Sequence, residues 1–223
     1  MQHRTVEDLM THSVVRVQRD TPFKKIVRTL ADHDVTAVPV VDDLGHPVGV
    51  VSEADLLRTV ADRPDPAGLL PPLRADGLDT APEGATAEEL MTAPPVCARP
   101  EWSVVEAART MDANKVKRLP VVGETGVLVG IVSRGDLLRI FLRRDEAIRE
   151  EISGDVLVRT LGLDPADLTI TVTDGRVAVT GTVQDESLVP VIEQLCRGVD
   201  GVVSVTADIT SRADGPSGPS DRR

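Results

Sequence analysis

Aromatic residues are nearly missing from this chain of 223 residues, which has two phenylalanines, one tryptophan and no tyrosine. The hydrophobic fraction of 41% is therefore almost entirely aliphatic, and we expect aliphatic cores. Proteins that bind single-stranded nucleic acids use aromatic faces interleaved with basic residues. Because such faces are missing and the formal net charge is −11, the sequence argues against a nucleic-acid partner.

Sets of residues that carry catalysis or hold metals are missing as well. Cys97 and Cys196 lie far apart and form neither a C-x-x-C pair nor a Cys/His cluster, which predicts free thiols rather than a disulfide or a zinc site. The four histidines lie near the N-terminus without a matching set of partners, and the glycines occur singly at turns, not in a loop that cradles phosphate. We therefore predict that the protein is not an enzyme and requires no metal or cofactor.

Targeting and membrane-spanning segments are the third class of missing feature. The N-terminal residues lack an apolar core followed by a small-residue cleavage site, and no window approaches the roughly 20 apolar residues that span a bilayer. We expect the protein to work in a reducing cytoplasm and not to associate with membranes.

A tandem repeat is the most prominent feature that is present. Leu9-Met10-Thr11 recurs as Leu90-Met91-Thr92, and Pro39-Val40-Val41 recurs as Pro120-Val121-Val122, a constant shift of 81 residues. The segment that contains Ser52 and Asp55 recurs with the same shift around Ser133 and Asp136. Self-similarity at a fixed period indicates one supersecondary unit used twice, and we expect each copy to bury its apolar face against the other.

Within each copy, the hydrophobic pattern predicts the order strand, helix, strand, strand, helix. In the first copy we predict strands at 14–17, 37–41 and 47–51, with helices from about 21 and from 53 to about 60. The second copy has corresponding strands at 96–98, 119–122 and 128–132 and helices at 104–114 and 134–142. The copies occupy residues 1–62 and 86–143, and the intervening 63–85, rich in Pro, Gly and Asp, are predicted to be a linker.

The motifs L-M-T, P-V-V and G-[VI]-V-S-x-x-D-L-L, present twice in this order, resemble a pair of CBS domains over residues 5–60 and 86–143. This resemblance implies an α+β fold in which the two clefts between the copies bind adenine nucleotides or related adenosyl ligands. It also implies a flat homodimer. In such pairs the matching Asp holds the ribose hydroxyls and the Ser lies near ribose or phosphate. The residues beside the first strand, here Thr11 to Val15 and Thr92 to Val96, line the base pocket.

The Ser-x-x-Asp motif at 52–55 and 133–136 has two interpretations. It lies where a strand ends and a helix begins, and there it can act as a capping box without any ligand. A helix start also exposes amide groups that favour an anion, and a nearby carboxylate can accept from a ribose diol. The same residues can do both.

The two copies differ at the positions where phosphate binding would be decided. The second copy carries Lys115, Lys117, Arg118 and Arg134 where the first has Asp34, Thr36, Ala37 and Glu53. Cationic side chains neutralise phosphates through charge-assisted hydrogen bonds, so we expect the cleft dominated by the second copy to bind the ligand. The alternative is that these cations form a solvated face. The predicted binding residues are Ser133, Asp136, Arg134, Lys117, Arg118, Thr92 and Val96, together with Ser52, Asp55, Thr11 and Val15.

After residue 144 the pattern becomes helix, hairpin, helix and strand, with Asp174-Gly175 as a strong hairpin turn. The motifs D-G-R-V-A-V-T-G-T-V and G-V-D-G-V-V-S-V resemble a BON domain, a small α/β sandwich, which we place at 144–211. BON domains are often proposed to bind phospholipid. Residues 145–211, however, contain 13 acidic and 4 basic side chains, a net charge of −9 that an anionic bilayer would repel. We favour contact with a protein partner, and we expect a disordered tail at 212–223.

Two classes of function remain. In the first, AMP, ADP or ATP binds between the repeats and the BON-like domain passes the change to a partner, which requires a different affinity for two states. In the second, the CBS-like pair binds no ligand and serves as a structural scaffold. Phospholipid association through the BON-like domain is a further alternative.

Overall fold

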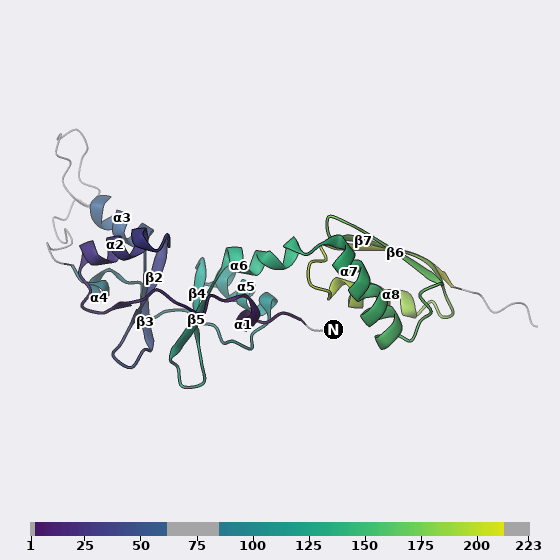
Figure 1. The fold of residues 1–223 in the computed structure, drawn as a ribbon, viewed down its shortest axis with the longest axis horizontal. Helices are drawn as coiled ribbons and strands as arrows, with labels where there is room; N and C mark the ends of the chain where they lie inside the picture. Colours follow the sequence, from purple (N-terminus) through teal and green to yellow (C-terminus); the bar gives the residue numbers. More distant parts are fainter. Residues whose placement is uncertain (1–2, 62–84, 212–223) are drawn as a thin grey trace, which may run out of the picture. The chain divides into compact units, whose positions relative to one another are not determined.

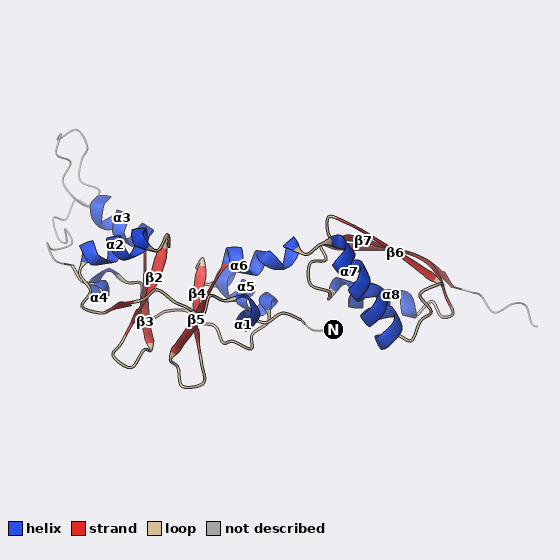
Figure 2. Cartoon of the chain, in the orientation of Figure 1, coloured by secondary structure: helices blue, strands red, loops and turns tan. Residues whose placement is uncertain are grey.

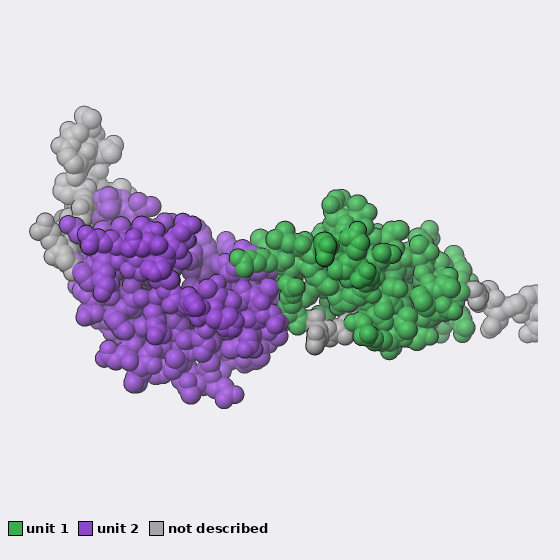
Figure 3. Space-filling model, viewed as in Figure 1, with its two compact units in different colours: residues 1–4, 138–223 green, residues 5–137 purple. Residues whose placement is uncertain are grey.

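The computed structural model describes residues 3–61 and 85–211. The linker predicted at 63–85, except its last residue, and the tail predicted at 212–223 lie outside the described residues. The chain divides into two compact units, residues 5–137 and residues 138–223 with the first four residues (Figure 3).

The unit formed by residues 5–137 contains both copies of the repeat (Figure 1). The first copy consists of α1 (Val6–Leu9), β1 (Val17–Gln18), α2 (Phe23–Asp32), β2 (Ala37–Val41), β3 (Pro47–Ser52) and α3 (Glu53–Ala61). The second consists of α4 (Ala87–Leu90), α5 (Val104–Ala113), β4 (Arg118–Val122), β5 (Leu128–Ser133) and α6 (Arg134–Leu138), after which a 3-10 turn, η1 (Arg139–Leu142), begins the next unit.

Both hairpins of this unit have the same register. Pro39 lies opposite Val50 in the antiparallel pair β2–β3, and Pro120 lies opposite Ile131 in β4–β5. Strand β2 is buried along its whole length, in keeping with its uninterrupted apolar sequence. The repeat seen in the sequence is thus a repeat of structure.

The opening strand of each copy is shorter than the pattern predicts. In the first copy only Val17 and Gln18 pair with β2, and in the second a single bridge joins Ala98 to Val121. The residues just before Val96 are Pro94 and Pro95, which have no N–H to donate to a neighbouring strand. Apolar composition alone therefore overestimates these strands.

Two short helices, α1 and α4, were not predicted. Each begins with a capping box: the Thr5 amide donates to Asp8 (2.8 Å) and the Thr86 amide donates to Glu89 (2.8 Å). The signal was present in the sequence as Thr-x-x-Asp and Thr-x-x-Glu.

Each copy contributes its opening segment to the other copy. In the first copy, the amide of Val6 donates to the Trp102 carbonyl (2.8 Å) and the amide of Thr11 donates to the Ile131 carbonyl (2.9 Å), both in the second copy. In return, Thr92 of the second copy pairs in both directions with Val50 of the first (2.9 and 3.1 Å). The core of the first copy accordingly includes Ala87 from α4. The two copies share one structure rather than packing as separate modules.

The C-terminal unit is a three-stranded sheet with helices on one face (Figure 2). Helix α7 (Asp145–Glu151) continues as a π-helical stretch, η2 (Ile152–Thr160), followed by β6 (Leu168–Thr173), β7 (Arg176–Val183), α8 (Leu188–Arg197) and β8 (Ser204–Ser211). The β6–β7 hairpin turns at Asp174 and Gly175, both with positive φ (49° and 70°), as the Asp-Gly signal predicts. The core joins Leu168, Val177, Val179 and Val183 of the sheet to Ile148, Ile152, Leu157 and Ile192 of the helices.

Candidate functional site

A cleft between the two copies has a volume of about 180 Å³. Both copies line it, because the segment that follows α1 lies beside the end of β5. The lining residues are Thr11, Ser13, Val14, Val15, Val35 and Ala37 from the first copy and Arg118, Ile131, Ser133 and Asp136 from the second. Its volume is below the range of roughly 300–1,000 Å³ typical of small-molecule sites, so a ligand of that size requires side chains to move.

Ser133 and Asp136 meet at the junction of β5 and α6. The backbone amide and the hydroxyl of Ser133 both donate to Asp136 Oδ2, at 2.9 and 2.6 Å. The Asp136 amide in turn donates to Ser133 Oγ at 3.3 Å. This is the geometry of a capping box, and it holds the carboxylate at the edge of the cleft.

Arg118 spans the two copies across this cleft. Its guanidinium donates to the carbonyl of Ala37 (3.2 Å) and to the hydroxyl of Thr36. Burial lowers the pKa of Arg118 from its ordinary value, and the nearby carboxylates of Glu53 and Asp136 oppose that shift. A half-buried cation with acidic neighbours thus lies at the boundary between the copies.

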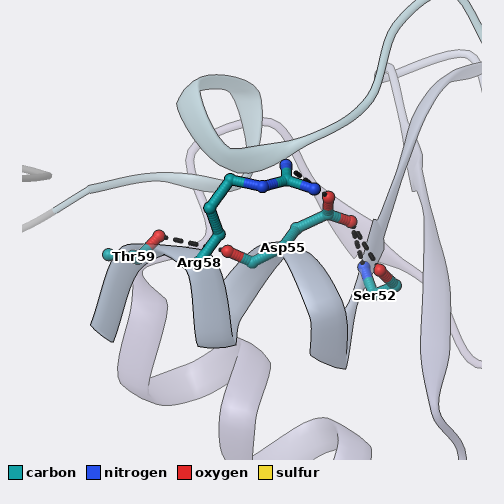
Figure 4. Close-up of polar contacts among 4 residues, drawn as sticks. All are labelled: Ser52, Asp55, Arg58 and Thr59. Atoms are coloured by element: carbon teal, nitrogen blue, oxygen red, sulfur yellow. Dashed lines mark hydrogen bonds and ion pairs between the residues drawn. The ribbon is translucent and has the colours of Figure 1, made fainter. Parts of the chain in front are cut away.

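The corresponding motif of the first copy has the same two hydrogen bonds from its serine (Figure 4). Ser52 donates to Asp55 Oδ2 from its amide (2.9 Å) and its hydroxyl (2.6 Å). Arg58 Nη1 lies 3.4 Å from Asp55 Oδ1, so both carboxylate oxygens have protein partners. The segment after Thr92 lies beside this motif, as the segment after Thr11 lies beside Ser133. At the positions equivalent to Ser13 and Val14 it has Pro94 and Pro95, which lack a backbone N–H.

The predicted binding residues divide into three groups. The cleft brings together Ser133, Asp136, Arg118, Thr11 and Val15. Thr92 pairs with Val50, two residues before Ser52, so it lies near the Ser-x-x-Asp motif of the first copy and not in the cleft. Val96 lies on the same segment as Thr92. Among the described residues, Arg134 and Lys117 do not line the cleft: Arg134 donates to the Val116 carbonyl from Nε (3.2 Å) and Nη2 (3.0 Å), and Lys117 is exposed.

Three lining residues were not predicted, namely Val35, Ala37 and Ile131. Ala37 stands 81 residues before Arg118, so the repeat could have identified it as the partner position across the cleft. Val35 and Ile131 are aliphatic, and nothing in their residue type marks them as ligand-binding.

Within 3–61 and 85–211, no group of three or more His, Cys, Asp or Glu side chains is placed to hold a metal ion. In the same ranges, no helix is both long enough and apolar enough to cross a membrane.

Comparison with known families matches the CBS domain to residues 6–62 and 87–143 and the BON domain to residues 144–213. Protein MJ1426 of Methanocaldococcus jannaschii is 28% identical over 153 residues, which cover 61% of this chain and 90% of MJ1426. The chloroplastic CBS domain-containing protein CBSX2 of Arabidopsis thaliana is 32% identical over 152 residues, which cover 62% of this chain and 64% of CBSX2. The chain thus spans less than two thirds of CBSX2.

A solved structure of CBSX2 in complex with AMP is similar in fold. It has a TM-score of 0.51 and 31% sequence identity, covering 62% of this chain and 96% of the compared one.

Proposed function

Since the chain belongs to the CBS domain family and carries a C-terminal BON domain, we propose that it is a non-catalytic regulatory protein that binds an adenine nucleotide in the cleft lined by Ser133 and Asp136. The observation that carries the proposal is the composition of this cleft, in which a carboxylate, a hydroxyl and a guanidinium converge beside the apolar residues Val14, Val15 and Ile131. The relative CBSX2, whose structure holds AMP, supports AMP as the first ligand to test.

Each group has a chemical role in this proposal. The Asp136 carboxylate accepts from the ribose hydroxyls, and Ser133 keeps it in place through two hydrogen bonds. Arg118 binds the phosphate after exchanging its hydrogen bonds to Thr36 and Ala37 for charge-assisted ones. The apolar lining packs against the adenine ring.

The proposal favours this cleft over the equivalent position beside Asp55 because the segment next to Asp55 contains Pro94 and Pro95, which have no backbone N–H to donate to a ligand. The cations Arg134 and Lys117 have no part in this preference, because they lie outside the cleft lining among the described residues.

Calorimetry on the full chain tests the proposal with AMP, ADP, ATP, adenosine and S-adenosylmethionine. We expect one AMP site per chain, and Asp136→Asn is expected to weaken AMP binding by roughly 10-fold to 100-fold, the range for hydrogen bonds to a charged group. Asp55→Asn is the matched control, because it alters the same capping motif in the other copy. Equal loss in both variants, or none in either, would contradict the assignment. A chain that binds none of the five compounds would point to the scaffold alternative.

We also propose that the CBS pair forms a homodimer and that the BON domain contacts a protein partner. Exposed apolar side chains on the helices of the pair, including Val27 (41% exposed) and Leu57 (66%), support the dimer. The net charge of −9 over residues 145–211 supports a protein partner over an anionic membrane. Sedimentation with vesicles rich in anionic lipid tests the second point, and binding to such vesicles would overturn it.

A further inference from the structure

The chain passes between its two compact units twice. The C-terminal unit consists of residues 138–223 together with the first four residues, so the chain enters it along two separate segments. We call these segments the N-terminal connector (residues 3–4) and the central connector (residues 138–144). Both belong to the C-terminal unit, and both continue covalently into the CBS pair.

Both connectors are attached to Asp200, which lies between α8 and β8. The backbone amide of Arg4 donates to Asp200 Oδ2 at 3.0 Å, and Arg143 Nη1 donates to the Asp200 carbonyl at 2.9 Å. The guanidinium of Arg143 is held in turn by Glu151, whose Oε2 lies 2.8 Å from Nη2. One residue of the C-terminal unit therefore binds both segments by which the chain enters that unit.

The loop between α8 and β8 packs closely on the central connector. A Cβ at Gly201, which has a φ of +93°, would lie 3.0 Å from the Ile140 carbonyl oxygen and 3.3 Å from the Arg143 Cβ. On the other side of this loop, Val199 is buried in the same core as Cys196. Because close-packed regions transmit strain, a movement of the central connector reaches this core.

In the CBS pair, each connector leads to one copy's part of the ligand cleft. The N-terminal connector continues through α1 and Met10 to Thr11, which lines the cleft and whose amide donates to the Ile131 carbonyl at 2.9 Å. The central connector follows α6, whose first turn contains Asp136, another lining residue. The two walls of the cleft are thus the starting points of the two connectors.

The segment between the N-terminal connector and Thr11 is held along its length. The Val6 amide donates to the Trp102 carbonyl at 2.8 Å. Met10 packs so closely on Gly130 that a Cβ there would lie 2.3 Å from the Met10 sulfur. With so little free space around it, this segment passes a displacement of Thr11 along to the connector.

From these contacts we infer that Asp200 couples the ligand cleft to the BON domain. The inference rests on the proposed nucleotide site and specifies how that site acts on the C-terminal unit. The cleft, of about 180 Å³, must change shape to admit a ligand of ordinary size, which moves Thr11 relative to Asp136. Since Arg4 and Arg143 carry this movement to the same residue, the hydrogen bonds of Asp200 differ in strength between the empty and the filled state, as coupling requires.

Two probes follow the two units without any ligand. Trp102, the single tryptophan, reports by fluorescence on the unit that contains the CBS pair. The buried Cys196 reports on the C-terminal unit by its reaction with a thiol reagent, in a Cys97→Ala background that removes the other thiol. Gly130→Ala forces Met10 to move and should lower the urea midpoints of both probes by on the order of 0.5 M.

Asp200→Ala is expected to break this link. The Trp102 midpoint should still fall when Gly130→Ala is added to Asp200→Ala, whereas the Cys196 midpoint should no longer follow. The inference fails if the Cys196 midpoint ignores Gly130→Ala with Asp200 in place. It fails equally if Gly130→Ala shifts that midpoint by the same amount with and without Asp200→Ala.

Two further variants test the hydrogen bond between Arg4 and Asp200 itself. Asp200→Asn is the matched control, because its side-chain oxygen can still accept from the Arg4 amide, and it should keep the link between the probes. Arg4→Pro removes the donor and should behave as Asp200→Ala does. Loss of the link in Asp200→Asn, or its survival in Arg4→Pro, would exclude this hydrogen bond as the route.

AMP then tests whether the same link carries the signal. Calorimetry first establishes that the wild type and Asp200→Ala bind AMP, since Asp200 does not line the cleft. At an AMP concentration of roughly 100 times Kd, the reaction of Cys196 should slow at least about 10-fold in the wild type and stay unchanged in Asp200→Ala. If AMP binds the wild type without slowing this reaction, the coupling is overturned and the nucleotide site stands. If AMP does not bind, the proposed ligand fails, and the urea midpoints alone decide whether Asp200 couples the units.

Discussion

The side chain of Met91 lies directly over the backbone of Gly49, so that a Cβ at Gly49 would stand 2.3 Å from the Met91 sulfur. The same relationship joins Met10 to Gly130, again at 2.3 Å. Each methionine comes from the opening segment of one copy and each glycine from the hairpin of the other. Because these two glycines have no side chain, the methionine of each opening segment can pack directly against the hairpin backbone of the other copy.

Substitution of Gly49 should test this close approach. Gly49→Ala forces Met91 to move within a packed region, and we expect a loss of roughly 1–3 kcal/mol in the free energy of unfolding, as for other overpacked cores. Urea denaturation followed by circular dichroism measures it. The control is Gly135→Ala in α6, where the new Cβ meets only Ser133 Oγ at 3.7 Å and the first copy already has Ala54. Equal stability of the two variants would contradict the role given to Gly49.

Arg118 should distinguish ligands with and without phosphate. Arg118→Ala removes the guanidinium that we propose to bind phosphate, so AMP affinity is expected to fall by roughly 10-fold to 100-fold while adenosine affinity changes little. Calorimetry with both compounds on the same variant gives the comparison. A parallel loss for AMP and adenosine would mean that Arg118 shapes the cleft without contacting phosphate.

The buried thiol of Cys196 should make the C-terminal unit sensitive to alkaline pH. Burial, with a smaller contribution from Glu193, raises the pKa of Cys196 from 9.0 to about 11. Between these values the native state holds a proton that the unfolded state has lost, so this contribution to stability is complete below pH 9 and declines as pH rises toward 11. Denaturation midpoints across that range are expected to fall more steeply for the wild type than for Cys196→Ala. Parallel profiles would contradict the expectation.

The ion pair between Arg143 and Glu151 should contribute more to the free energy of unfolding than the ion pair between Arg197 and Glu193 on α8. Arg143 Nη2 lies 2.8 Å from Glu151 Oε2, with both side chains at most 20% exposed, and Arg143 Nη1 also donates to the Asp200 carbonyl at 2.9 Å. Glu151→Gln should cost about 1–3 kcal/mol, because a partly buried guanidinium loses its charged partner. Glu193→Gln is the matched change at the pair with Arg197, whose side chain is 57% exposed, and should cost at most about 0.5 kcal/mol. The prediction fails if chemical denaturation finds the two variants alike.

Local signals were sufficient to predict much of the fold. The apolar strand from Ala37 to Val41 and the hairpin turn at Asp174-Gly175 occur where the sequence indicates them, since each depends on neighbours within a few residues. The CBS and BON resemblances are confirmed by the family matches. The ends of the opening strands were less well predicted, because their pairing depends on residues distant in the chain.

The sequence by itself determined the 81-residue repeat, the Ser-x-x-Asp motif in each copy and the charge difference between the copies. All three can be read from residue types at a fixed spacing. Only the tertiary structure decided which copy supplies which wall of the cleft. Thr11 to Val15 lie with Ser133 and Asp136 because their segment crosses to the other copy, a pairing that has no local signature. The same structure directs Arg134 toward Val116, and of the four cations that first suggested phosphate binding only Arg118 lines the cleft among the described residues. Periodicity specifies what is repeated, but long-range packing specifies what each copy faces.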